Sequence, residues 1–393
     1  MNKIALTTAS KTILVLALSS FCMGVTEFII AGVLQDVKAH FNIDSNQAGY
    51  LTTMYAVGVV IGAPILTIPL SSFNRKWQLL LNLFVFAVAN FVIFVSDNFA
   101  LSVFARFIAG TQHGVFFVIA TLAAMQVSPK EKVSRNLAFM VSGLTIALVS
   151  GVPLGTFIGH LFGFKAIFLL ICLCTLIAFI SALIFMPNLT GTQTHFSSLI
   201  KAFLHKGLLK AYSITICTCG GAFVLYTYVT DLLTQKSHFG EEAIVYILLL
   251  YGVFAILGNL FGGRLADNKG SQRALQIVIL LQMIFYALVS VSAYSQALVV
   301  INLALMGFLS FASIPALKVN AMNMARKYTP DSMDSSVSVN EAAFNVGIAL
   351  ANQIGGLVVV APFLGVGFNP LFAALFALPA FILVMQKSEA TKT

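Results

Sequence analysis

The sequence predicts an all-α integral membrane protein with about twelve transmembrane helices. Hydrophobic residues make up 59% of the 393 positions and charged residues only 9%, and the mean hydropathy is +0.96. A soluble globular chain carries roughly 25% charged residues, so this chain has too little polar surface to cover a fold that faces water. Its apolar residues also form long runs, most of them near the ~20 residues that a helix needs to cross the hydrocarbon core. Lipid is therefore the expected solvent for most of the molecular surface.

Polar and turn-forming clusters divide the chain into twelve apolar segments. The first run follows Lys3 and Lys11, but it is too long for the apolar region of a signal peptide, lacks a small-x-small cleavage site and contains Glu27. We therefore interpret it as a retained first span. The predicted spans are 12–34, 47–70, 77–96, 99–125, 136–160, 165–187, 208–232, 242–262, 274–294, 296–317, 337–361 and 369–386.

The longest polar break lies between the sixth and seventh spans. Residues 188–207 are richer in serine and threonine than the rest and carry Lys201, His205 and Lys206. This predicts a six-helix bundle over 1–187, a cytoplasmic linker over 188–207 and a second six-helix bundle over 208–393. Two bundles in the same orientation imply parallel repeats, an arrangement in which the substrate site lies near the midplane between the halves.

The distribution of lysine and arginine predicts the orientation. With the N-terminus inside, 18 of the 22 basic residues fall in cytoplasmic segments. Lys38, Lys165 and Lys236 fall outside, and Arg106 lies within a span. Cytoplasmic loops carry an excess of basic residues, so we expect both termini in the cytoplasm and the chain in the cell inner (plasma) membrane.

Composition and motifs also exclude several classes of function. The net charge of +9 is scattered over short loops rather than gathered on one face, which argues against nucleic-acid binding. The sequence has no Walker A motif, metal-ligand cluster or nucleophile constellation, so we expect no metal, no cofactor and no enzymatic activity. The five cysteines lie inside apolar runs, where small buried thiols are the simplest interpretation; they are Cys22, Cys172, Cys174, Cys217 and Cys219.

Two opposite charges are expected at the same depth in the membrane. Glu27 lies nine residues before Asp36, where the first span ends, and Arg106 lies nine residues after Asp97, where the fourth span begins. Both therefore lie about 13 Å below the outer surface. Ionisable groups at this depth are costly and indicate a functional site. We expect the two to pair and to serve in proton coupling, with a static ion pair that orients two helices as the alternative.

His113 follows Arg106 by two helical turns and lies on nearly the same face, beside Gly110 and Gly114. Histidine titrates near neutral pH, so His113 is a candidate both for proton relay and for substrate binding. A histidine that merely satisfies a polar contact in the core is the alternative. Phe117 is a candidate for an amphipathic cavity wall, although most of the 35 phenylalanines must serve packing or lipid contact.

Further candidate substrate contacts lie in the second half. Asn345 and Asn352 follow Glu341 on one polar stripe of the eleventh span. Amides that face lipid would lack partners, so we expect cavity lining, with inter-helix hydrogen bonding as the alternative. Tyr226 in the seventh span is a further candidate, whereas Asp231 is expected at the water boundary.

The loop after the eighth span carries the most specific motif. It reads Gly263-Arg-Leu-Ala-Asp267-Asn-Lys-Gly270 and resembles the Gly-x-Leu-Ala-Asp-x-x-Gly signature of the major facilitator superfamily. Gly263 permits close packing, Gly270 permits a turn with positive φ, and Asp267 can cap a helix N-terminus. The corresponding loop after the second span has Ser71 where the aspartate belongs and Asn74 where the second glycine belongs. The resemblance implies a latch that is weaker in this first copy.

Other spans extend the resemblance over essentially the whole chain. Arg106 followed by spaced glycines is similar to a motif of proton-coupled members, and Gly151-Val-Pro153-Leu-Gly155 is similar to the antiporter signature of exporters, with Val152 where that signature has glycine. Together with Thr26-Glu27-Phe28 and Phe344-Asn345-Val-Gly347, these motifs resemble the sugar-efflux (arabinose-efflux-like) branch of the drug:proton antiporters. The resemblance implies the major facilitator fold.

The leading hypothesis is therefore a secondary active transporter that acts by alternating access. It would couple proton entry to the efflux of a small solute such as a drug, sugar or metabolite, and would function as a monomer in the bilayer. The alternative within transport is a proton-coupled importer or facilitator of a small polar metabolite. A membrane-embedded enzyme or a sensor is less well supported, because the sequence shows neither clustered catalytic groups nor a soluble domain.

Overall fold

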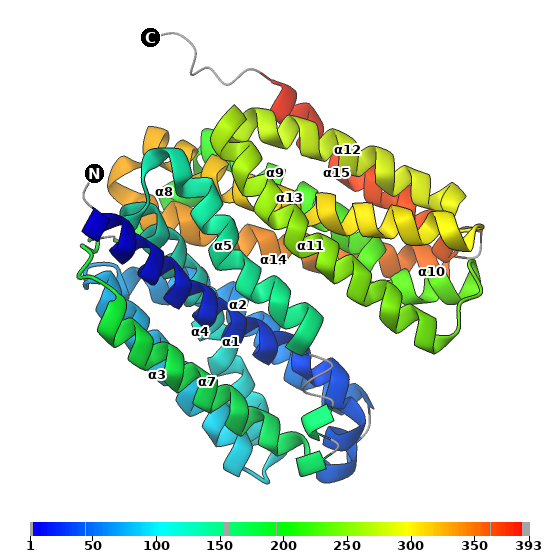
Figure 1. Cartoon of the computed structure of the whole chain (residues 1–393), viewed down its shortest axis with the longest axis horizontal. Coiled ribbons are helices and arrows are strands. Elements are labelled where there is room, and N and C mark those ends of the chain that lie inside the picture. Colours follow the sequence, from blue (N-terminus) through cyan, green and yellow to red (C-terminus); the bar gives the residue numbers. More distant parts are fainter. Residues whose placement is uncertain are drawn as a thin grey trace. The chain divides into compact units, whose positions relative to one another are not determined.

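The computed structural model describes residues 3–43, 45–151, 157–159, 161–193, 195–361 and 363–386. Within these ranges the chain is almost entirely helical (Figure 1), and twelve of its segments are long and apolar enough to cross a membrane. The predicted fold class and the expected number of spans are confirmed.

The chain divides into two compact units. Unit 1 comprises Met1–Phe203 and Thr329–Ala342, and unit 2 comprises Leu204–Tyr328 and Ala343–Thr393. The sequence-based boundaries at 187 and 208 stay a prediction. The structure differs from them in one respect, because it groups 329–342 with the first half of the chain.

Unit 1 contains the first six spans, and its first helix is unusually long. Backbone angles that are not helical at Val33 (φ −123°, ψ 17°) mark a kink in that helix. The elements are α1 (Lys3–Phe41), α2 (Ser45–Leu70), α3 (Arg75–Val95), α4 (Phe99–Val127), η1 (Lys130–Lys132), α5 (Val133–Ile146), the π-helical η2 (Ala147–Gly151), α7 (Phe164–Phe185) and α8 (Phe196–Leu204).

Unit 2 contains the remaining spans, and α14 is divided between the two units at residue 342. The elements that follow α8 are α9 (Lys206–Tyr226), α10 (Val229–Gln235), α11 (Glu241–Lys269), α12 (Ser271–Ser292), α13 (Gln296–Tyr328), η3 (Pro330–Ser332), α14 (Met333–Val360), η4 (Val366–Phe368) and α15 (Asn369–Met385). Helix α13 continues well beyond its predicted end at 317, because Asn320, Met322 and Ala325 remain buried in protein.

The helices pair in the same order in both units. In unit 1, α2 packs on α4 and α3 packs on α7, and in unit 2, α11 packs on α13 and α12 packs on α15. Figure 1 shows α3 beside α7 and α12 beside α15. This recurrence is what two six-helix repeats in one chain would produce.

Glycines bring the paired helices into backbone contact. A Cβ atom added to Gly58 would lie 2.3 Å from the carbonyl oxygen of Phe107, and one added to Gly110 would lie 2.1 Å from that of Tyr55. In unit 2 the corresponding distance from Gly258 to the oxygen of Phe308 is 1.9 Å. No side chain fits at such distances, so α2–α4 and α11–α13 are close contacts that depend on glycine.

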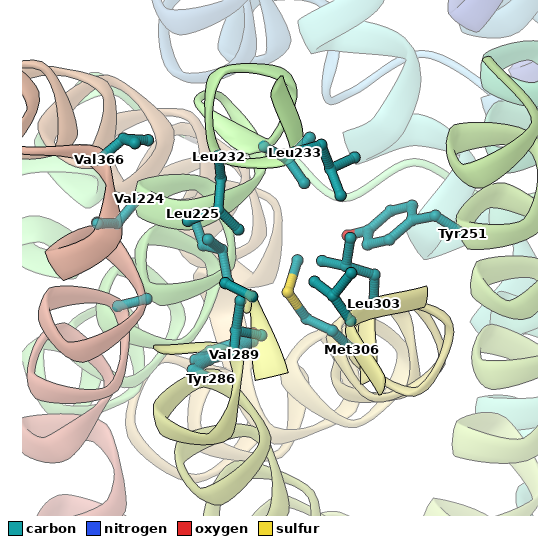
Figure 2. Packing of buried hydrophobic residues seen from close by; sticks show 14 of the residues in the cluster. Val224, Leu225, Leu232, Leu233, Tyr251, Tyr286, Val289, Leu303, Met306 and Val366 are labelled. Carbon is teal, nitrogen blue, oxygen red and sulfur yellow. The ribbon is translucent and has the colours of Figure 1, made fainter. Parts of the chain in front are cut away.

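Each unit also has packing of its own. In unit 2, Tyr251 points toward Leu303 and Met306 in an apolar cluster that also contains Tyr286 and Val289 (Figure 2). In unit 1, the carboxylate of Asp97 accepts hydrogen bonds from Lys165 and from the His40 ring at 3.1 Å. These two partners, Lys165 first, hold the pKa of Asp97 below its ordinary value.

Replacing Gly110 with alanine tests the glycine contact. We expect Gly110→Ala to destabilise the protein by about 1–3 kcal/mol, because the added methyl group forces α2 and α4 apart. The loss is measured as a lower Tm of the purified protein in detergent. Gly240→Ala is the matched control, since nothing lies within 4 Å of a Cβ atom at Gly240. Equal Tm values for the two variants would contradict the close approach.

Candidate functional site

The candidate site lies in unit 1, where α1, α2 and α4 meet. It contains Glu27 from α1, Tyr55 from α2, and Arg106 and His113 from α4. Arg106, Gly110 and His113 follow one another at intervals of four and three residues, so they share one face of α4. The structure thus brings together the three residues that the sequence singled out for proton coupling, and it adds Tyr55.

Arg106 is fully buried and is held mainly by backbone carbonyl groups. Its Nη1 donates to the carbonyl oxygen of Thr26 at 2.7 Å and its Nε to that of Leu51 at 3.0 Å. Its guanidinium carbon lies 4.2 Å from the centre of the Tyr55 ring, a cation–π distance. Nη2 is buried and has no hydrogen-bond partner among the described residues. One donor of this cation is therefore left for a further acceptor.

Among the described residues, Glu27 and Arg106 do not form the expected ion pair, and neither residue belongs to the pairs His40–Asp97, Arg75–Asp334 and Lys165–Asp97. The two groups are still close enough to interact electrostatically. Carbonyl groups of α1 and α2 hold Nη1 and Nε of the guanidinium in place, and Glu27 does not reach the remaining Nη2. The Glu27 carboxylate is half-buried beside a fixed positive charge, without a direct pair.

Tyr55 connects Arg106 with His113. Its hydroxyl lies 2.7 Å from Nδ1 of His113 and donates weakly to the carbonyl oxygen of Met23 at 3.3 Å. The imidazole also packs against Phe117, with ring centres 5.0 Å apart. Sequence reasoning did not identify Tyr55. A phenol in the middle of an apolar span was the available signal, because a tyrosine hydroxyl away from the membrane interface needs a polar partner.

The substrate-binding candidates of the second half lie on different helices, Tyr226 on α9 and Asn345 on α14. The half-buried Tyr226 stacks on Tyr251 with ring centres 4.9 Å apart. Asn345 is half-buried on α14. The side chain of Asn352 lies outside the described residues. Asp231 is exposed, as expected for the water boundary.

The conformational motifs are only partly described. Gly151 ends the π-helical turn η2, a local change of helix type that is common at functional sites, whereas Pro153 and Gly155 lie outside the described residues. In the second loop, Gly270 has φ +80°, which agrees with the positive φ allowed for in the sequence interpretation. Gly263 is buried, and Asp267 is half-buried in the last turns of α11.

The first loop is built differently. Asn74, which replaces the second glycine of the motif, has φ −56° and caps α3 by accepting a hydrogen bond from the Lys76 amide at 2.9 Å. Ser71, which replaces the aspartate, donates to the carbonyl oxygen of Ile68 at 2.6 Å. Both replaced positions therefore make local hydrogen bonds.

Arg75, at the start of α3, forms a second charged cluster that sequence reasoning missed. It donates two hydrogen bonds to Asp334 of α14, Nη1 to Oδ2 at 2.6 Å and Nη2 to Oδ1 at 2.7 Å. The two side chains are only 0% and 1% exposed. Both residues belong to unit 1. A buried bidentate pair of this kind ties the first turn of α14 to the first turn of α3.

These features define a class of protein. Twelve candidate spans, paired helices that recur in two units, and ionisable side chains buried inside membrane helices are typical of a solute transporter. Among the described residues, no group of three histidine, cysteine, aspartate or glutamate side chains is placed to hold a metal.

Comparison with known proteins identifies the family. The model of the Major Facilitator Superfamily matches residues 16–352. The chain therefore belongs to the major facilitator superfamily; it is a multi-pass membrane transporter of a small solute and is not an enzyme.

Relatives in two bacteria support this assignment. The chain is 36% identical to the uncharacterised transporter YtbD of Bacillus subtilis, over 90% of each chain, and 30% identical to the inner membrane transport protein YdhP of Escherichia coli, over 96% of each. It is 27% identical to AraJ of Escherichia coli, which is named as a transporter, over 95% of this chain and 92% of AraJ.

A solved structure shows the same fold. The human organic anion transporter MFSD10 has a TM-score of 0.78 to this chain at 15% identity, with 98% of this chain and 100% of that chain covered. Identity at this level supports the fold alone.

Breaking the Arg75–Asp334 pair tests the second cluster. We expect Arg75→Gln or Asp334→Asn to destabilise the protein by about 3–5 kcal/mol, because either leaves a buried charge without its partner. The double variant should recover part of the loss, since it leaves neither charge. Tm measurements on the three proteins check this, with Lys165→Gln at the exposed Asp97 pair as a control that changes Tm little. Additive losses in the double variant would show that the two residues do not act as a pair.

Proposed function

We propose that this chain is a proton-coupled exporter of a small solute and works by alternating access. The observation that carries the proposal is the state of Glu27. It is a carboxylate inside a membrane helix, under the influence of the Arg106 charge, yet outside the ion pairs that the described residues form. Such a group can exchange a proton without first breaking a salt bridge.

The residues around Glu27 have distinct roles in this proposal. Arg106 supplies a positive charge that does not depend on Glu27, because its hydrogen bonds go to the carbonyl groups of Thr26 and Leu51. A substrate that neutralises that charge would change how readily Glu27 exchanges a proton. Tyr55 and His113 form a second pair that can exchange protons. Their position beside Phe117 makes this part of unit 1 a candidate substrate contact as well.

The antiport direction rests on the Gly151-Val-Pro153-Leu-Gly155 motif, which resembles the antiporter signature of exporters. Lysine and arginine placement supports termini in the cytoplasm. The protein would act as a monomer. During the cycle, the Arg75–Asp334 pair would have to break whenever the first turn of α14 leaves α3. The substrate would be a small drug, sugar or metabolite, and a thermal-shift screen of the purified protein against sugars, nucleosides, amino acids and lipophilic cations would narrow this range.

Glu27→Gln tests the proton role. In everted vesicles we expect this variant to lose uptake driven by the proton gradient, because the amide takes up no proton. Exchange of labelled for unlabelled substrate at equal pH should persist, since exchange requires binding but no net proton movement. The control is Asp231→Asn, which alters an exposed carboxylate.

Wild-type rates of gradient-driven uptake in Glu27→Gln would refute proton coupling through Glu27. If the proton gradient drove uptake in right-side-out vesicles and not in everted ones, the alternative function of a proton-coupled importer would be favoured.

Tyr55→Phe tests the link between Tyr55 and His113. The variant keeps the ring below Arg106 and removes only the hydroxyl group, so we expect about 1 kcal/mol of lost stability. The rate of gradient-driven uptake should fall by about fivefold or more, because a fivefold change corresponds to about 1 kcal/mol. Tyr286→Phe is a matched control, because it removes a hydroxyl that lies 3.0 Å from Ser310 in unit 2. Equal transport by the two variants would assign Tyr55 to packing.

A further inference from the structure

The linker helix α8 carries an exposed apolar face. Phe196, Ile200, Phe203 and Leu204 are 58%, 53%, 58% and 65% exposed. At 100° per residue these four positions fall within one arc of about 100° on the helix. Ala202, on the other side, is fully buried. Large apolar side chains gathered on one face of a short polar linker are not accounted for by the transport site.

The chain places this helix at the surface of the bilayer. Only His205 separates the end of α8 from Lys206, where the seventh candidate span begins. One extended residue spans at most about 3.6 Å, so α8 ends at the level where that span meets the membrane surface. His205 is extended (φ −72°, ψ 118°), and its Nδ1 accepts the amide of Gly207. The two helices are therefore separate elements, and α8 does not continue the span.

The other end of the linker is also fixed. The Arg75 amide donates to the carbonyl oxygen of Leu189 at 2.9 Å, and the Leu189 amide donates to Asn74 Oδ1 at 3.3 Å. A Cβ atom on Gly191 would lie 2.1 Å from the carbonyl oxygen of Phe73. The segment that leads into α8 thus lies directly against the loop between the second and third spans. The linker is attached at both ends and is not a free tether.

The charged residues of the linker and of the first turn of α9 are all basic. Residues 188–210 contain three lysines, at 201, 206 and 210, and no aspartate or glutamate. Lys201 is exposed and lies at the edge of the apolar arc, and Lys206 is also exposed. Long lysine side chains at such an edge can reach the headgroups while their neighbours enter the acyl region. On the expected orientation, this surface faces the inner leaflet, where anionic lipids attract basic segments.

We propose that α8 lies in the plane of the inner leaflet and binds acidic phospholipid. Phe196, Ile200, Phe203 and Leu204 enter the boundary between headgroups and acyl chains, while Lys201 and Lys206 contact the anionic headgroups. The chain enters a membrane span directly after α8, and the charged residues beside the apolar face are basic. These two features favour an acidic lipid surface over a second copy of the chain or a soluble protein.

A single tryptophan reports the position of the helix. Trp77 is the only tryptophan of the chain, so W77F provides a background into which Phe203→Trp is introduced. The full-length protein is reconstituted in phosphatidylcholine vesicles that contain phosphatidylglycerol, and quenching by lipids brominated high on the acyl chain is measured. We expect strong quenching of Phe203→Trp and little quenching of the control Gln193→Trp, which is exposed in the linker before the helix.

Quenching of Phe203→Trp no greater than that of the control would overturn the proposal. The same result with emission shifted to the blue would show that protein, such as a second copy, covers the apolar face.

Charge variants test lipid selection. The rise of Tm with added phosphatidylglycerol is titrated for wild type and for the double variant Lys201→Gln/Lys206→Gln. We expect the apparent affinity for phosphatidylglycerol to fall about fivefold for each lysine removed. The double variant Lys130→Gln/Lys132→Gln, at the exposed η1 turn, is matched in charge and should keep the wild-type titration. Equal weakening in both double variants would indicate nonspecific attraction and would remove α8 as the lipid site.

Discussion

The close approach of α2 and α4 is the constraint on which the candidate site depends. Gly110 separates Arg106 from His113 on one face of α4, and a Cβ atom at Gly110 would lie 2.1 Å from the Tyr55 carbonyl oxygen. With no side chain there, the Tyr55 backbone enters the gap between the two polar residues. Its ring then reaches the guanidinium of Arg106 at 4.2 Å, and its hydroxyl reaches Nδ1 of His113 at 2.7 Å. One backbone contact therefore positions the three side chains.

The same contact explains how unit 1 tolerates a buried arginine. A cation removed from water must recover its hydrogen bonds within the protein. Because α1 and α2 lie close to α4, the carbonyl groups of Thr26 and Leu51 are within reach and accept these bonds. The positive charge is thus held by neutral dipoles of the backbone, and these hydrogen bonds do not involve Glu27.

The sequence predicted the spans and the polar members of the site, because an ionisable residue in an apolar run is visible by composition alone. It predicted a Glu27–Arg106 ion pair wrongly, since equal depth says nothing about which carbonyl groups compete for the guanidinium. Tyr55 was missed because a tyrosine among apolar residues resembles ordinary packing. Arg75 and Asp334 were missed because each looks like a charged residue of a loop. They are 259 residues apart in the sequence, and only the tertiary structure brings them together.

The two units use one helix frame for different chemistry. Gly58 meets the carbonyl oxygen of Phe107, and Gly258 meets that of Phe308, so the position before Phe308 corresponds to Arg106. In unit 2 that position is Gly307, whose Cβ would lie 2.6 Å from the Tyr251 carbonyl oxygen and 3.0 Å from its ring. The space that a side chain would need is filled by an aromatic residue. A repeated frame therefore holds a charge in unit 1 and an aromatic contact in unit 2, so the buried cation is confined to one half of the frame.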